Sequence, residues 1–316
     1  MRRVRKFLPP LLGLVLLAAM VAELHKVLGK VGLDGILAAF VATPFTDVLR
    51  AGGLLLCSVA IMAAYDLPGV CFARRAHECP RVPLAKIGLA SFCAYALSHI
   101  LGAPALTAAA IRLRFYAHWD VPAAGLARIV ALSGSSFTLG VLSVLGLILA
   151  LDPVIVPLPG DIALALLRAL GIGLLMVPVF YVVAASRLES LTIFKRAIKL
   201  PGWRIALGQL GLSCLDICCA CAILYMVLPG SSGLTYVYIL SLYVAAFWVG
   251  ALSGLPGGVG VFDSVLLLGL TDYISANTAL GAILLFRIIF FLVPACLAGL
   301  CYAVHELHIY TKAKTE

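Results

Sequence analysis

Long apolar segments are the feature that most limits how this chain can fold. A helix needs about 20 consecutive, mostly apolar residues to cross the hydrocarbon core of a bilayer. Windows of this kind recur along the whole chain, near residues 7–24, 47–66, 86–110, 129–151, 161–185, 203–228, 234–252, 256–271 and 279–303. They predict an all-α polytopic membrane protein.

The composition agrees with that class. Apolar residues make up 63% of the 316 residues and charged residues only 12%, whereas a soluble domain has about 45–50% and about 25%. Eight spanning helices would use about half of the chain, and short loops, broken helices and termini account for the rest. We therefore expect residues 1–316 to form a single transmembrane domain with no soluble domain, so that any transport takes place within the membrane.

The positive charges are clustered along the chain. There are 23 Lys and Arg against 14 Asp and Glu, a net charge of +9. Five groups hold 18 of the 23 cations, in residues 2–6, 74–86, 112–128, 187–204 and 312–314. In membrane proteins such groups mark cytoplasmic loops. None of them has the interleaved aromatic residues typical of nucleic-acid binding, so we expect no nucleic-acid partner.

These basic groups also constrain the topology. If residues 86–110 crossed the membrane, the third basic group would lie outside, against the positive-inside rule. We therefore predict that this segment enters and returns on one side, with a break at Gly102-Ala-Pro104, where proline interrupts the helix. The acidic turns at Asp152 and Asp272 then lie outside. This topology has about eight spanning helices, at least one re-entrant helical segment and both termini in the cytoplasm, as in a multi-pass protein of a bacterial inner membrane.

A second Gly/Pro break lies in the other half of the chain. The short segment 256–271 begins within Leu255-Pro-Gly-Gly-Val-Gly260, and paired broken segments often mark the binding site of a transporter. The backbone N–H groups of Gly257 and Gly258 would suit an anion at the start of a helix. The GxxxG spacing of Gly250 with Gly254, and of Gly254 with Gly258, favours close helix packing as a competing interpretation.

Charged side chains inside apolar segments are costly, so each needs a partner or a function. Asp216 lies midway along one window and Arg287 lies in the last, while Asp263 closely follows the glycine break and His99 precedes the other break. One interpretation is that Arg287 pairs with Asp216 or with Asp263 simply to lower the cost of insertion. The other is that these groups line a polar cavity for a charged substrate. The two interpretations are compatible if the ion pair can open to admit a zwitterionic substrate.

The sequence Arg112-Leu-Arg114-Phe-Tyr116 directly follows the first broken segment. Two guanidinium groups and a phenol suit a phosphate group, because guanidinium binds phosphate in a bidentate manner. The alternative is that the arginines only set the topology beside lipid headgroups. H-E-x-x-H, P-loop and dinucleotide motifs are absent, and the G-x-S-G protease motif at Gly230–Gly233 has no histidine at a matching depth. We therefore expect no enzyme: no catalytic residue, no metal and no cofactor.

Several motifs also occur in a recognisable order over about two thirds of the chain. They are Tyr95-Ala-Leu-Ser-His99, Arg112-Leu-Arg114-Phe-Tyr116, Phe137-Thr-Leu-Gly140, Leu215-Asp216, Leu224-Tyr225 through Leu228-Pro229, Leu252-Ser-Gly-Leu-Pro-Gly-Gly-Val-Gly-Val-Phe-Asp263, and Phe286-Arg287 with Pro294. Together they resemble the lysylphosphatidylglycerol synthase transmembrane region family, best known as the flippase part of the bacterial multiple peptide resistance factor. That family usually has Glu at the position of Asp263.

The resemblance implies a flippase that moves aminoacylated phosphatidylglycerol, or a related phospholipid, from the inner to the outer leaflet and so supports resistance to antimicrobial peptides. Arg112, Arg114 or Arg287 would hold the phosphate, and Asp216 or Asp263 the cationic amine. We expect no synthase domain after the last helix and therefore a separate lipid synthase as a partner, and self-association is a further expectation. Two other classes fit the residues: an ion-coupled solute transporter, and a non-transporting membrane partner of a lipid-modifying or glycosyl-transferring enzyme.

Overall fold

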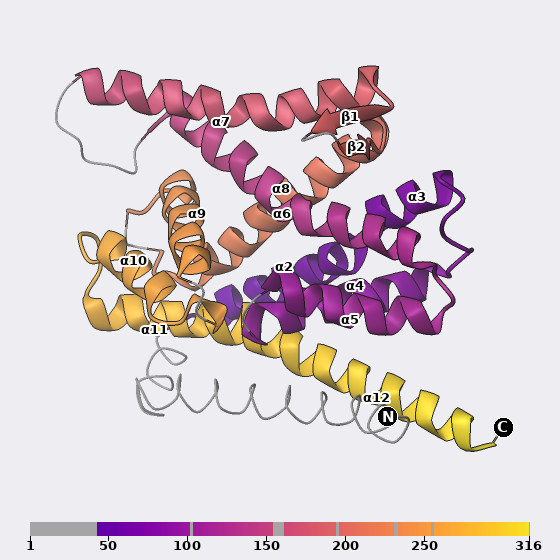
Figure 1. Cartoon of the computed structure of the whole chain (residues 1–316). Coiled ribbons are helices and arrows are strands. Elements are labelled where there is room, and N and C mark those ends of the chain that lie inside the picture. The colour runs from indigo at the N-terminus through magenta and orange to yellow at the C-terminus, as the bar shows by residue number, and fades with distance from the viewer. Residues whose placement is uncertain are drawn as a thin grey trace.

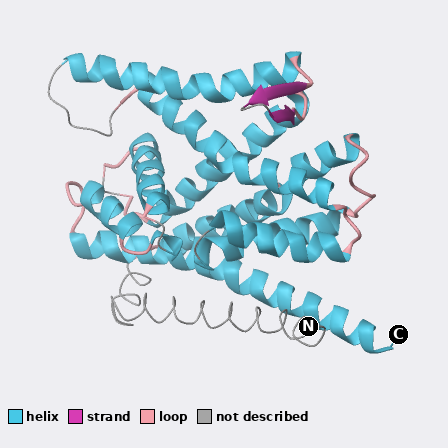
Figure 2. Cartoon of the chain, viewed as in Figure 1, coloured by secondary structure: helices cyan, strands magenta, loops and turns pink. Residues whose placement is uncertain are grey.

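The computed structural model describes residues 43–101, 104–153, 161–193, 196–230, 233–253 and 256–315, and helices dominate them (Figures 1 and 2). In chain order the elements are α2 (Phe45–Ala64), α3 (Leu67–Arg75), α4 (Leu84–Leu101), α5 (Pro104–His118), α6 (Ala123–Leu151), α7 (Asp161–Arg187), β1 (Ser190–Ile193), β2 (Arg196–Lys199), α8 (Trp203–Val227), α9 (Tyr236–Leu252), the 3-10 helix η1 (Pro256–Gly258), α10 (Val261–Leu270), α11 (Ala276–Phe286), the π-helix η2 (Arg287–Leu292) and α12 (Val293–Thr315). The helix predicted at residues 7–24 lies outside the described residues.

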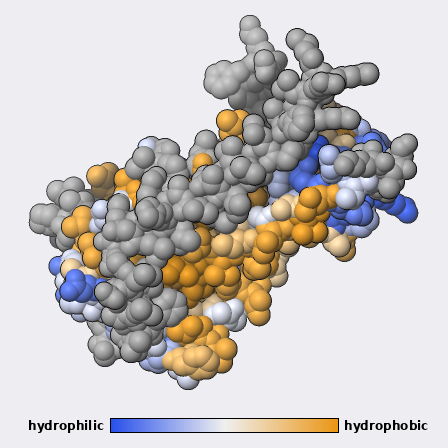
Figure 3. Space-filling view, turned by 90° about the horizontal axis from the view of Figure 1, so that it is seen from below, coloured by the Kyte–Doolittle hydropathy of each residue, from blue (hydrophilic) through white to orange (hydrophobic). Residues whose placement is uncertain are grey.

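Within the described residues, 6 helical spans are long and apolar enough to cross a membrane. They are Phe45–Arg75, Leu84–Leu101, Ala123–Leu151, Leu164–Arg187, Trp203–Val227 and Ala276–Thr311. Figure 3 shows hydrophobic residues across the middle of one face and hydrophilic residues towards its ends. The protein is therefore an all-α polytopic membrane protein, as predicted. The apolar windows do not predict the short antiparallel β1–β2 hairpin, in which Ser190 pairs with Lys199.

The predicted break in residues 86–110 separates two helices that form a hairpin. Helix α4 ends at Leu101 and α5 begins at Pro104, which suits a helix start because proline has no N–H to satisfy. The two outer ends of the hairpin meet, since the Lys86 ammonium lies 5.5 Å from the centre of the Trp119 ring. The hairpin has the shape expected of a segment that enters and returns on one side.

The basic groups within the described residues gather at one end of the bundle. Arg75 donates to the Pro201 carbonyl over 3.4 Å, which joins α3 to the turn before α8. Arg128 at the start of α6 donates two hydrogen bonds to the Glu78 carboxylate, over 2.5 Å and 2.8 Å. The end of α12 lies on the same side, and the α10–α11 turn lies at the opposite end (Figure 1). The first basic group, residues 2–6, lies outside the described residues.

Small residues let the helices approach closely. A β-carbon on Gly171 of α7 would lie 2.5 Å from the backbone nitrogen of Ala150 in α6, and one on Gly140 of α6 would lie 2.7 Å from the β-carbon of Ser213 in α8. Such contacts replace the hydrophobic driving force that is missing between helices in lipid. Helix α7 is the outermost span, with 11% of its apolar window buried. Arg168 is exposed on this helix.

Candidate functional site

Arg287 and Asp263 form a largely buried ion pair between η2 and α10. Arg287 begins the π-helix, a geometry that is frequent at functional sites. Its Nε and Nη2 donate to the Asp263 carboxylate over 2.5 Å and 3.0 Å. The guanidinium also lies 5.3 Å and 5.5 Å from the ring centres of Phe262 and Phe291. Of the two pairings that the sequence left open, this is the one that forms, and it compensates each charge that it buries.

The glycine-rich turn before α10 holds this pair in place. The Gly257 carbonyl accepts hydrogen bonds from Nη1 and Nη2 of Arg287, both over 3.3 Å, and the Gly260 N–H donates to Asp263 over 2.8 Å. Gly257, Gly258 and Gly260 have φ angles of +59°, +60° and +86°, which residues with a side chain rarely adopt. Glycine is therefore required here by the backbone itself.

The two Gly/Pro breaks of the chain meet at this turn. A β-carbon on Gly257 would lie 3.3 Å from the carbonyl oxygen of His99, which closely precedes the first break. A β-carbon on Gly258 would lie 3.2 Å from the α-carbon of Gly250 in α9. The prediction of close packing is therefore confirmed for Gly250 and Gly258, while Gly254 lies outside the described residues. Anion binding by the backbone of Gly257 and Gly258 stays a prediction.

Arg112 and Tyr116 contact a carboxylate that sequence reasoning missed. Asp66, between α2 and α3, has an exposed fraction of 0%. Its carboxylate accepts hydrogen bonds from Arg112 Nε over 2.8 Å, the Tyr116 hydroxyl over 3.1 Å and the Ser133 hydroxyl over 2.8 Å. Its N–H donates to the Ser91 hydroxyl over 3.1 Å. Because Asp66 ends an apolar window, it resembles an ordinary loop residue, and only the tertiary packing reveals its burial.

Arg114 has a different partner from Arg112. Its Nε and Nη2 each lie 2.7 Å from a carboxylate oxygen of Glu306 in α12. The Arg114 side chain is 36% exposed and that of Arg112 only 5%. Residues two positions apart on a helix do not share a face, so the structure does not bring the two guanidinium groups together as the phosphate hypothesis expects. Their role as phosphate ligands stays a prediction, and it requires the present ion pairs to open.

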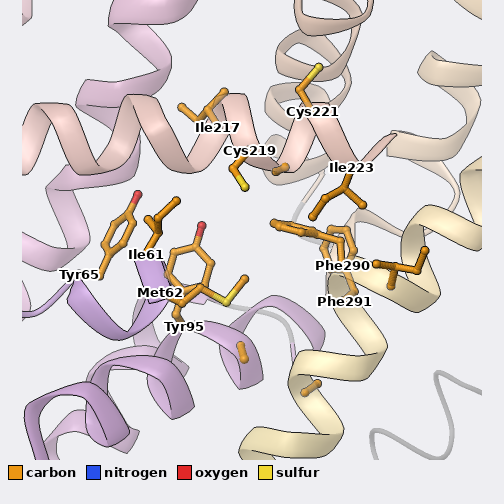
Figure 4. Close-up of a cluster of buried hydrophobic side chains, with 14 of the residues drawn as sticks. Ile61, Met62, Tyr65, Tyr95, Ile217, Cys219, Cys221, Ile223, Phe290 and Phe291 are labelled. Atoms are coloured by element: carbon orange, nitrogen blue, oxygen red, sulfur yellow. The ribbon is translucent and has the colours of Figure 1, made fainter. Parts of the chain in front are cut away.

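Asp216 lies in the middle of α8 and has an exposed fraction of 1%. Its Oδ2 accepts hydrogen bonds from the Tyr65 hydroxyl, over 3.4 Å, and from the Tyr95 hydroxyl, which is closer. Figure 4 shows both hydroxyls directed toward α8. Within the described part of the chain, Asp216 Oδ1 has no hydrogen-bond partner and no Lys or Arg forms an ion pair with this carboxylate. Asp216 therefore differs from the acids that pair with arginine.

These polar groups adjoin one another inside the apolar bundle. Tyr65, which contacts the Asp216 carboxylate, directly precedes Asp66 in the chain. On the other side, the rings of Tyr95 and His99 lie 4.4 Å apart, and His99 Nδ1 is 2.8 Å from the Tyr95 carbonyl. The His99 carbonyl in turn lies next to Gly257, in the glycine-rich turn that contacts Arg287. These polar groups therefore form a row from the Asp66 ion pair, past Asp216, to the Arg287 ion pair, linked by neighbouring residues and ring contacts.

A surface pocket of about 400 Å³ lies at the outer end of the α4–α5 hairpin. Arg81, Lys86 and His118 contribute cationic or titratable groups to its lining, together with Trp119 and Asp120. The sequence predicts the basic group at residues 74–86 but not that Arg81 and Lys86 line a pocket with His118 and Trp119. Because the pocket is basic and partly aromatic, it suits an anionic headgroup at a membrane surface.

Comparison with known proteins identifies relatives but no activity. No family model matches the chain. It is 30% identical over 310 residues to the uncharacterized protein slr0712 of Synechocystis, an alignment that covers 97% of this chain and 94% of that protein. It is 28% identical over 262 residues to the inner membrane protein YbhN of Escherichia coli, covering 82% of this chain and 80% of the relative.

Proposed function

The chain belongs to the family of the Synechocystis protein slr0712, and from its polar row we propose that it is a flippase that moves a phospholipid from the inner to the outer leaflet. One observation carries this proposal: among the described residues Asp216 is buried without a cation, whereas the buried Asp66 and the partly buried Asp263 are each paired with an arginine. The motifs that resemble the lysylphosphatidylglycerol synthase transmembrane region support the same class. They favour aminoacylated phosphatidylglycerol, or a related lipid with a cationic amine, as the substrate.

The location follows from the relative and from the charges. The Escherichia coli relative is an inner membrane protein, and we propose the same membrane for this chain. The basic end of the bundle then faces the cytoplasm by the positive-inside rule. Both chain ends would be cytoplasmic, and the basic pocket at the α4–α5 hairpin would meet headgroups of the inner leaflet.

The physical task of a flippase is to lower the cost of taking a charged headgroup through hydrocarbon. In the proposed mechanism the negative charge of the Asp216 carboxylate balances the positive charge of the lipid amine. The rings of Tyr65 and Tyr95, 4.9 Å apart beside it, offer aromatic faces that attract an ammonium group. The phosphate is held first by Arg81 and Lys86 at the pocket, and then by an arginine whose ion pair opens. The acyl chains stay in the bilayer.

The test uses purified protein in vesicles that contain lysylphosphatidylglycerol with a fluorescent acyl chain. The label is quenched from one side only, so the rate at which lipid changes leaflet is measured directly. We expect the wild type to move the lipid, and Asp216→Asn to reduce the rate to that of empty vesicles. Asp272→Asn is the matched control, because Asp272 is an exposed acid at the far end of the bundle.

Other outcomes of this test identify the alternative classes. Equal rates for wild type and empty vesicles would overturn the flippase proposal. Uptake of a soluble compound by the same vesicles would then indicate the ion-coupled solute transporter. If wild type and Asp216→Asn support growth equally in cells that depend on the protein, and neither moves lipid or solute, the non-transporting partner is correct.

A further inference from the structure

The three acids of the polar row, of which Asp66 and Asp216 are buried and Asp263 is partly buried, differ in how their charge is balanced. Asp66 has Arg112 within 2.8 Å, and Asp263 has Arg287 within 2.5 Å. Asp216 has only neutral hydroxyl donors, and both of these bind the same oxygen. Its second oxygen, Oδ1, has no partner among the residues that the structure describes.

This arrangement matches a carboxylic acid better than a carboxylate. A buried carboxylate without a cation is strongly unfavourable, whereas a protonated carboxyl group needs only ordinary hydrogen bonds. In the protonated form Oδ2 is the carbonyl oxygen and accepts hydrogen bonds from both phenols. The proton lies on Oδ1, where it is a neutral donor without a partner among the described residues, which costs less than a bare buried carboxylate. The charged state becomes favourable only when a cation arrives beside it.

Among the residues that the structure describes, no Lys or Arg pairs with Asp216 to balance its charge. The titratable groups that face it are Tyr65 from α2, Tyr95 from α4, Tyr243 from α9 and Cys219 on α8 itself. His99 lies one ring beyond Tyr95. The neighbouring arginines of the row are already paired with their own acids.

We propose that Asp216 is a proton-binding site, and that a proton and the cationic amine of the lipid compete for it, so that lipid export is coupled to proton entry. This inference rests on the proposed flippase function. On the outer side a proton binds Asp216 as the amine leaves. On the inner side the proton dissociates to water as the next amine binds. One positive charge occupies the site in each direction, so the bundle never holds the bare carboxylate.

The coupling is tested in the same vesicles by adding a trapped pH indicator and a pH gradient. Lipid transport by the wild type should accelerate when the side of lipid release is acidic, and proton flux in the opposite direction should accompany it. Asp216→Asn should lose both the acceleration and the proton flux, whereas Asp272→Asn should keep both. Tyr95→Phe removes one hydroxyl donor and should slow both fluxes together.

A spectroscopic measurement separates loss of coupling from loss of folding. The wild type at neutral pH should show the infrared band of a protonated carboxyl group, and folded Asp216→Asn should lack it. Lipid transport that ignores the pH gradient and moves no protons would overturn the coupling but keep the flippase proposal. If the infrared band of the protonated carboxyl group persisted in Asp216→Asn, the proposed proton coupling would also be overturned. Proton flux without lipid transport would instead overturn the flippase proposal while keeping the proton site.

Discussion

Replacing Asp66 by asparagine removes the counter-charge of Arg112 while keeping the size of the side chain. Arg112 would remain as a guanidinium with 5% of its side chain exposed, and breaking one partner of a buried ion pair costs about 3–5 kcal/mol. The Tyr116 and Ser133 hydroxyls would also lose a charged acceptor, although the remaining amide oxygen can still serve one of them. We therefore expect Asp66→Asn to lower the free energy of unfolding by about 3–5 kcal/mol.

The assay is reversible unfolding of the purified protein in mixed detergent micelles. Arg112→Gln and the double variant with Asp66→Asn complete a mutant cycle, in which the double variant should cost less than the sum of the single ones by about 0.5–3 kcal/mol. Arg114→Gln is the matched control on the same helix. Its ion pair with Glu306 is partly exposed, so its loss should cost about 1 kcal/mol or less. If Asp66→Asn costs no more than Arg114→Gln, the reasoning from burial is refuted.

Three further predictions concern packing, topology and pH. Gly171→Val should lower stability by about 1–3 kcal/mol, because its β-carbon would meet the backbone of α6, whereas Gly173→Val, with open space around it, should cost much less in the same unfolding assay. A single cysteine at Ala117, in a variant without native thiols, should react with a thiol reagent from the cytoplasm, and labelling from the other side would contradict the re-entrant topology. The hydrogen bond from Arg128 lowers the pKa of Glu78. Glu78 therefore adds stability above its ordinary pKa of about 4.3 and loses it as the pH falls through its lowered pKa, so unfolding of wild type and Glu78→Gln should differ at neutral pH and converge in acid.

The sequence was sufficient for the fold class and for the breaks in the helices. Hydropathy reports the bilayer directly, because each spanning helix must be apolar over most of its length. The helix boundaries at Leu101 and Pro104 follow from the chemistry of proline alone. The π-helix that begins at Arg287 could not be predicted, because the apolar window 279–303 runs from α11 through η2 into α12 without a local signal.

The candidate site was only partly predictable, because its pairs form between distant segments. Arg287 had two candidate acids, and nothing in the spacing distinguishes Asp263 from Asp216. The partner of Arg112 is Asp66, 46 positions away, and a carboxylate at the end of an apolar window gives no sign of burial. The motif Arg112-Leu-Arg114 suggested that both guanidinium groups bind the same phosphate. Residues two positions apart on a helix lie on different faces, however, so the helix itself separates the two side chains.

The balance of charge within the row distinguishes structural acids from functional ones. An acid that holds a buried arginine contributes first to stability, so changing Asp66 or Asp263 should destabilise the protein before any effect on transport can be assigned. Replacing Asp216 by asparagine leaves no cation unpaired among the described residues and keeps an oxygen that can accept the hydrogen bonds of Tyr65 and Tyr95. Asp216→Asn should therefore fold about as well as the wild type and yet lose transport. Stability retained together with transport lost is the result that a purely structural role for Asp216 cannot produce.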